Sequence, residues 1–110
     1  MIELPDAPTM RDYQAYVHAM EAHHGWLDVD LVHNCFLMGE EVGELFKAVR
    51  NYNKLFTEAA KQVDEDAVAH VAEELVDVFN YLVAIANRLG IDLEAAFRQK
   101  NDENMKRTWT

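Results

Sequence analysis

Glycine, proline and cysteine are scarce in this chain of 110 residues, and each scarcity narrows the choice of folds. Both prolines lie within the first eight residues, and only four glycines follow them. Long helices are therefore favoured, because little interrupts the middle of the chain. The single cysteine, Cys35, excludes an intrachain disulfide and is typical of a reducing compartment.

Basic residues are also few, with ten Lys and Arg against twenty Asp and Glu, so the formal net charge is −10. We expect neither a nucleic-acid polymer nor a membrane as partner, because anionic surfaces are repelled by this charge. The chain has no run of about 20 apolar residues for a membrane span and no recognisable signal peptide. Half of the residues are hydrophobic, which predicts a globular protein, and the length of 110 residues predicts one domain over residues 1–110. From the single cysteine and the lack of a signal peptide we expect a cytoplasmic location.

The spacing of apolar residues predicts an all-α fold of four helices. They span about residues 10–23, 28–53, 64–89 and 92–107, with a polar connection over 54–63. The expected N-terminal caps are Thr9 with Asp12, Asp28 or Asp30, Asp64 or Asp66, and Asp92. Gly25 should end the first helix, and Gly90 is suited to end the third.

One ten-residue pattern occurs twice, at 40–49 and again 33 positions later at 73–82. Each copy reads acid, acid, apolar, any, acid, apolar, Phe, any, any, apolar. The spacing i, i+3 places two acids on one side of each helix. These acids are Glu41 with Glu44, and Glu74 with Asp77. Two such helices side by side would gather four carboxylates, which repel one another unless a cation lies among them. Oxygen donors of this kind predict Mg²⁺ or Mn²⁺.

Two other interpretations of the acids are weaker. Solvated helix faces, with Glu40 and Glu44 paired to Lys47, would not require the same offsets in two copies. A di-iron bundle requires Glu-x-x-His on each of two helices, and the chain has it once, at Glu21 and His24. The acids flank the apolar stripes rather than lying within them. We therefore expect a homodimer or homotetramer to cover that flank.

The last predicted helix carries a stripe that changes from apolar to cationic. Leu93 and Phe97 are followed on the same stripe by Lys100, Asn104 and Arg107. These cations either complement the helix dipole or hold an anionic ligand. Beside a carboxylate metal site, their spacing favours binding of phosphates.

Three aromatic or histidine positions allow two interpretations each. Trp26 is either a core residue or a stacking surface for a base, and Tyr81 lies one turn beyond Asp77 as a core or ligand residue. His70 lies one turn before Glu74, where it either orients that carboxylate or forms an exposed pair.

These motifs resemble the MazG-type nucleotide pyrophosphohydrolases of the all-α NTP pyrophosphatase superfamily, over about residues 10–107. The resemblance rests on three stretches, which are 40–44, 74–92 and the Lys100, Asn104, Arg107 spacing. It implies a four-helix MazG-like bundle completed by oligomerisation. It also implies Mg²⁺ held by Glu41, Glu44, Glu74 and Asp77, and phosphates held by Lys100, Asn104 and Arg107. His18 and Trp26 resemble base-contacting positions of dCTP-hydrolysing relatives.

The implied reaction is hydrolysis of a nucleoside triphosphate to monophosphate and pyrophosphate, as in nucleotide-pool house-cleaning. The metal would lower the pKa of a bound water, and Glu40 or Glu44 would take its proton. Two alternatives stay open, namely a phosphoribosyl-ATP pyrophosphohydrolase and a non-catalytic helical binding module. The cationic last helix favours the nucleoside triphosphate over phosphoribosyl-ATP.

Overall fold

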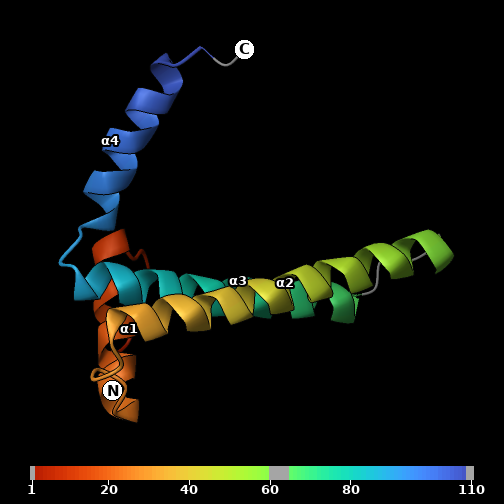
Figure 1. The fold of residues 1–110 in the computed structure, drawn as a ribbon, viewed down its shortest axis with the longest axis horizontal. Helices are drawn as coiled ribbons and strands as arrows, with labels where there is room; N and C mark the ends of the chain where they lie inside the picture. The colour runs from red at the N-terminus through yellow and green to blue at the C-terminus, as the bar shows by residue number, and fades with distance from the viewer. Residues whose placement is uncertain (1, 60–64, 109–110) are drawn as a thin grey trace. The chain divides into compact units, whose positions relative to one another are not determined.

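The chain folds into helices in the computed structural model, which describes residues 2–59 and 65–108. Within these residues there are four helices and no strand, which confirms the predicted all-α class. Figure 1 shows them as α1 (Met10–His24), α2 (Leu31–Ala59), α3 (Glu65–Arg88) and α4 (Leu93–Lys106). No helix in these two stretches is long and apolar enough to cross a membrane.

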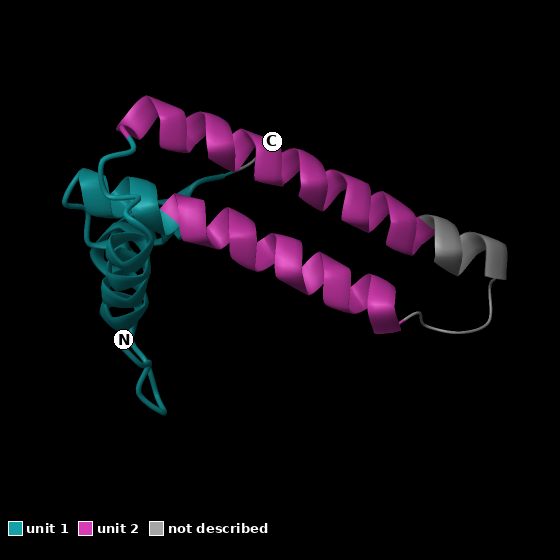
Figure 2. Ribbon diagram, turned by 90° about the horizontal axis from the view of Figure 1, so that it is seen from below, with its two compact units in different colours: residues 1–29, 83–110 teal, residues 30–82 magenta. Residues whose placement is uncertain are grey.

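The helices are distributed over two compact units, coloured separately in Figure 2. Unit 1 comprises residues 1–29 and 83–110, and unit 2 comprises residues 30–82. Helix α3 contributes to both, because its last turns belong to unit 1. A single domain over residues 1–110 stays a prediction.

In unit 1, α1 has the predicted ends. The Thr9 hydroxyl accepts from the Asp12 backbone N–H at 3.2 Å, and Asp12 Oδ2 accepts from the Thr9 backbone N–H at 2.8 Å. This reciprocal capping box satisfies two backbone donors that the first turn leaves without partners. Gly25 ends the helix at φ 75°, and the following Trp26 N–H donates to Glu21 O at 2.8 Å.

The turn between α3 and α4 also follows the sequence signals. Gly90 has φ 66°, and the Ile91 N–H donates back to Ala86 O at 2.9 Å. Asp92 then caps α4, because its Oδ1 accepts from the Ala95 N–H at 3.1 Å. Glycine is favoured at such a positive φ because it has no Cβ.

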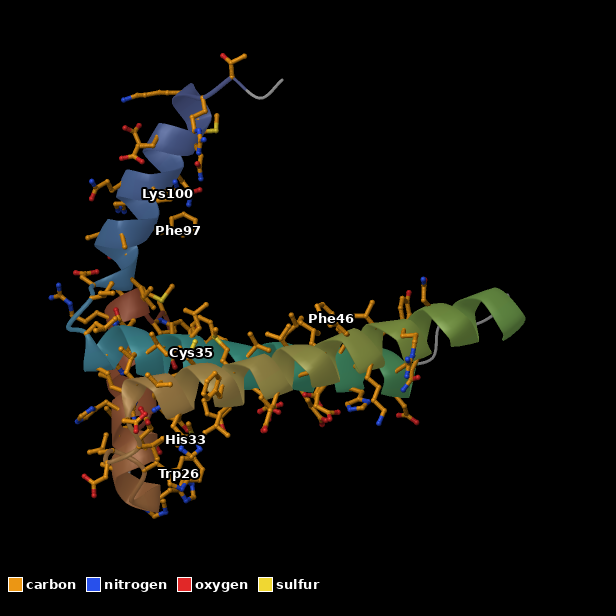
Figure 3. All side chains as sticks on the ribbon, in the orientation of Figure 1. Trp26, His33, Cys35, Phe46, Phe97 and Lys100 are labelled. Carbon is orange, nitrogen blue, oxygen red and sulfur yellow. The ribbon has the colours of Figure 1, made fainter. Side chains whose placement is uncertain are left out.

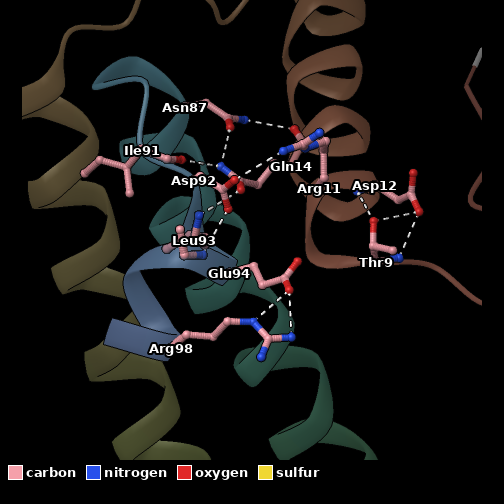
Figure 4. A network of polar contacts seen from close by, with 11 residues as sticks. Thr9, Arg11, Asp12, Gln14, Asn87, Ile91, Asp92, Leu93, Glu94 and Arg98 are labelled. Atoms are coloured by element: carbon pink, nitrogen blue, oxygen red, sulfur yellow. Dashed lines mark hydrogen bonds and ion pairs between the residues drawn. The ribbon is translucent and has the colours of Figure 1, made fainter. Parts of the chain in front are cut away.

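A polar network fixes this turn to α1 (Figure 4). The Gln14 side-chain amide donates to Ile91 O at 2.8 Å and to Asn87 Oδ1 at 3.1 Å, while its Oε1 accepts from the Leu93 N–H at 3.1 Å. Asn87 Nδ2 returns a bond to Gln14 O at 2.9 Å. One glutamine therefore satisfies a backbone carbonyl in the turn and a backbone N–H at the start of α4.

The most buried charges of unit 1 are Glu21 on α1 and Arg88 on α3. Arg88 Nη2 lies 2.8 Å from Glu21 Oε2, and Nη1 lies 3.2 Å from Oε1. The guanidinium also donates to the carbonyl oxygens of Val29, Trp26 and Ala84. Glu21 is therefore a structural residue. It is the acid of the one Glu-x-x-His motif in the sequence, so its pairing with Arg88 is evidence against a di-iron site.

In unit 2, α2 and the first part of α3 run side by side (Figures 1 and 2). Asp30 caps α2, since its Oδ1 accepts from the His33 N–H at 2.7 Å. The predicted connection over 54–63 is wrong at 54–59, where α2 continues as a helix. This stretch contains neither glycine nor proline to end the helix. Residues 60–63 and the predicted cap Asp64 lie outside the described residues.

The apolar side chains of the described residues are only partly enclosed. The buried ones are Val17, Ala48, Val83, Ala84 and Ala86. Larger members of the predicted apolar stripes stay exposed, with Phe46 at 70%, Leu75 at 53% and Phe97 at 65% of their surface. Completion of the bundle by oligomerisation stays a prediction.

Candidate metal centre

Three carboxylates of unit 2 converge on one point. Glu41 comes from α2, and Glu74 and Asp77 come from α3. One oxygen atom of each side chain lies within 4.8 Å of the other two, and no other such group occurs in the parts of the chain that the structure describes. The spacing i, i+3 places Glu74 and Asp77 on the same side of α3, and the neighbouring α2 supplies Glu41.

The electrostatics of this cluster are unfavourable without a cation. Partial burial raises the pKa of Glu41, and so does the charge of the neighbouring Asp77. Smaller increases come from a hydrogen bond with Glu74 and from the charges of Glu74 and Glu44. Like charges at this separation disfavour ionisation of all the acids together. A bound divalent cation would reverse that effect, because it stabilises the ionised carboxylates.

The residues present fit a hard divalent cation. Glu74 Oε2 is buried and has no hydrogen-bond partner among the described residues, although buried carboxylate oxygens normally have one. The cluster supplies oxygen ligands only, as Mg²⁺ and Mn²⁺ prefer. Asp77 is exposed, so the cluster is open to water or to a phosphate on that side.

Glu44 is not brought into the cluster, although its sequence offset matches that of Asp77. Its side chain is exposed, and it acts on the cluster through its charge on Glu41. Glu40 is exposed as well. Within the described residues neither acid forms an ion pair with Lys47, although both are exposed as on a solvated helix face. The metal-binding and catalytic roles of Glu40 and Glu44 stay predictions.

The predicted phosphate-binding residues lie in unit 1, whereas the carboxylates lie in unit 2. Lys100 is exposed on α4 (Figure 3) and has no ion pair in the described part of the chain. Asn104 is half-buried and donates to Asn101 Oδ1 at 3.2 Å. Arg107 follows the helix in extended backbone at φ −79° and ψ 145°. Their role in binding phosphate stays a prediction.

The predicted base-contacting residues also have defined surroundings. Trp26 is 48% exposed, and its ring stacks on His24 with centroids 4.4 Å apart, so it is not a core residue. His18 is exposed on α1, and Tyr81 is half-buried on α3. That these three side chains contact a nucleotide stays a prediction.

A family model described as the MazG nucleotide pyrophosphohydrolase domain matches residues 35–108, about two thirds of the chain. The chain belongs to the MazG family. The matched stretch includes the whole acidic cluster and the Lys100, Asn104 and Arg107 set, whereas His18 and Trp26 precede it. Membership in the MazG family indicates a nucleotide pyrophosphohydrolase activity. No curated protein matches the chain.

Proposed function

We infer that this MazG chain hydrolyses a nucleoside or deoxynucleoside triphosphate to the monophosphate and pyrophosphate, with Mg²⁺ as cofactor. The observation that carries the proposal is the cluster of Glu41, Glu74 and Asp77, in which Glu74 Oε2 has no partner within the described residues. Mn²⁺ is the alternative cation, since it takes the same oxygen ligands. House-cleaning of a cytoplasmic nucleotide pool is the proposed role.

Glu41, Glu74 and Asp77 would hold the ion, and Glu44 is the proposed fourth ligand. A bound Mg²⁺ would supply Lewis-acid chemistry, which lowers the pKa of water and polarises phosphate oxygens. Glu40 or Glu44, both exposed, would take the proton as the water oxygen bonds to the α-phosphorus. The bond from the α-phosphorus to the bridging oxygen breaks, and pyrophosphate leaves.

Phosphates would be held by cations of α4 and the segment after it. Lys100 has no partner among the described residues and lies one turn before Asn104 on α4. Arg107 adds a bidentate donor suited to phosphate oxygens. These donors would stabilise charge that develops on the leaving pyrophosphate. Trp26, His18 and Tyr81 are the proposed contacts to base and sugar, with Trp26 offering an exposed ring for stacking.

We expect a homodimer or a homotetramer. Phe46 and Leu75 of unit 2 and Phe97 of unit 1 support this, because each is a large apolar side chain that is exposed, and burial of apolar surface favours association. Sedimentation equilibrium at micromolar concentration measures the mass. A single species at the monomer mass of 12.7 kDa would contradict the expectation.

The decisive experiment incubates the purified chain with a panel of nucleoside triphosphates, in Mg²⁺ and in EDTA, and resolves the products by anion exchange. Monophosphate and pyrophosphate, formed only with the metal, support the proposal. Diphosphate and orthophosphate would contradict it. Turnover of phosphoribosyl-ATP alone would favour that alternative, and absence of turnover with retained nucleotide binding would favour a binding module.

A further inference from the structure

The two oxygens of the Glu74 carboxylate differ sharply in their surroundings. Glu74 Oε1 lies 3.2 Å from Nε2 of His70, which precedes it by one turn on α3. Glu74 Oε2 is buried and unpartnered within the described part of the chain. The Glu74 side chain is only 12% exposed, whereas that of His70 is 49% exposed. Solvent therefore reaches the imidazole much more easily than the carboxylate that it contacts.

The His70 imidazole lies within ion-pair distance of Glu74 Oε1, so it restrains rotation of the Glu74 carboxyl group on that side. The oxygen left over is the one without a partner in the described structure, and it is the oxygen available to a cation. A carboxylate held in advance loses less freedom when it binds an ion.

A simple helix-stabilising pair is a weaker explanation of this contact. Exposed pairs at i, i+4 stabilise helices best when the acid precedes the base, and here the histidine precedes the acid. The first copy of the acid motif has Leu37 at the matching position, four residues before Glu41. The histidine is therefore specific to the carboxylate that has the buried, unpartnered oxygen.

We propose that His70 is a positioning residue for the metal site, holding Glu74 Oε1 so that Oε2 is presented to a divalent cation. This inference rests on the metal site of the proposed function, and it adds a residue that touches neither the ion nor the nucleotide. Outer contacts of this kind typically change metal affinity by about 10–100-fold when removed.

The test is a Mn²⁺ titration of the metal-free chain, followed by the electron paramagnetic resonance signal of free Mn²⁺. We expect His70→Ala to weaken Mn²⁺ binding by about 10-fold. His70→Gln should recover most of the affinity, because its amide can donate to the same oxygen. His33→Ala is the matched control, an exposed histidine of unit 2 on α2, and should bind as the wild type does.

Thermal unfolding of the metal-free variants separates positioning from a structural role. His70→Ala should unfold close to the wild type without metal, and it should gain less thermal stability from added Mn²⁺. In a Glu74→Gln background, His70→Ala should cost no further affinity, because the carboxylate that it positions is gone.

Three results would overturn the inference. Unchanged Mn²⁺ affinity in His70→Ala would refute it while leaving the metal site of the proposed function intact. A lowered unfolding temperature with unchanged affinity would make His70 a helix-stabilising residue only. A wild-type chain that binds no Mn²⁺ would refute both the inference and the proposed metal site.

Discussion

Two shielded glutamates, one in each unit, illustrate opposite uses of a carboxylate. Glu21 in unit 1 is 5% exposed, and both of its oxygens are paired with the Arg88 guanidinium. Glu74 in unit 2 has a side chain that is 12% exposed, yet its closest charged neighbours include Glu41 and Asp77. The two residues are of the same type and are shielded to a similar degree. Glu21 has the Arg88 guanidinium to compensate its charge, whereas Glu74 lies among other acids.

This difference indicates a structural role for Glu21 and a role in binding for Glu74. A buried carboxylate costs free energy unless a partner compensates it, so Arg88 makes Glu21 part of the fold. Glu74 has only the His70 imidazole beside its Oε1, and its Oε2 has no hydrogen-bond partner among the described residues. Burial raises the pKa of Glu41, and the neighbouring acids raise it further. Unit 1 therefore depends on Arg88 to compensate the buried Glu21 charge, whereas the acids of unit 2 repel one another until a cation binds.

The largest expected effect tests the compensated pair. Arg88→Met should lower the free energy of unfolding by about 3–5 kcal/mol, because it leaves Glu21 charged and buried. The carbonyl oxygens of Val29, Ala84 and Trp26 each lose the guanidinium as a donor as well. Urea unfolding measures the loss. Arg98→Met is the matched control, since its pair with Glu94 is exposed and should be worth under about 0.5 kcal/mol. Equal stability of the two variants would remove the distinction between the units.

The next effect tests the uncompensated cluster through activity. Glu74→Gln should reduce pyrophosphate release by at least about 100-fold, equivalent to about 2.7 kcal/mol of transition-state stabilisation. The amide keeps the size of the side chain but removes a charged ligand. Glu73→Gln, an exposed acid one residue away on α3, should keep its activity. Full activity in Glu74→Gln, or undiminished turnover in EDTA, would contradict the metal site.

The sequence predicts the helix ends wherever the signal is local. Thr9, Gly90 and Asp92 act on backbone groups within one turn, so their residue types alone indicate the cap. The end of α2 lacks such a signal. Residues 54–59 are polar enough to resemble a connection, but no glycine or proline stops the helix there.

The cluster is predictable in part, because helical periodicity places residues around one helix but does not set how two helices face each other. Three of the four predicted acids meet, while Glu44 stays exposed on α2. The pair of Glu21 and Arg88 has no sequence signal, since the two residues are 67 positions apart and only the tertiary fold joins them. Spacing within α4 likewise carries no information on where Lys100 lies relative to the acids of another unit.

A smaller effect tests a compensated contact at the surface of unit 1. Thr9→Ala should cost about 1 kcal/mol of stability, because the N-cap oxygen is lost from α1. The Asp12 carboxylate in turn accepts from the Thr9 backbone N–H and from its hydroxyl, and these two bonds, in that order, lower the pKa of Asp12. The contribution of these two bonds to stability is therefore complete above the usual Asp value of 3.8 and is lost as the pH falls through the lowered pKa. Urea unfolding of the variant and of the wild type across acid pH should show the difference between them shrink, and Thr9→Ser should behave as the wild type.

The smallest expected effect has the opposite sign and concerns Glu41. Its pKa is raised, chiefly by partial burial and then by the Asp77 charge, so the folded state holds its proton more tightly than the unfolded state does. Stability of the metal-free chain should then fall as the pH rises from the usual Glu value of 4.5 through the raised pKa, and the full loss should be present at neutral pH.

The substitution Glu41→Gln removes this loss, so the metal-free variant should be slightly more stable than the wild type at neutral pH. The gain should be smaller than the contribution of the α1 cap, because the acids are partly exposed and their repulsion is screened. Added Mg²⁺ should reverse the order, since it stabilises only the chain that binds it. Thermal unfolding at pH 4 and pH 7.5, with and without Mg²⁺, measures both changes. A metal-free Glu41→Gln chain less stable than the wild type at neutral pH would show that the acidic cluster of unit 2 contributes to the fold as the charges of unit 1 do.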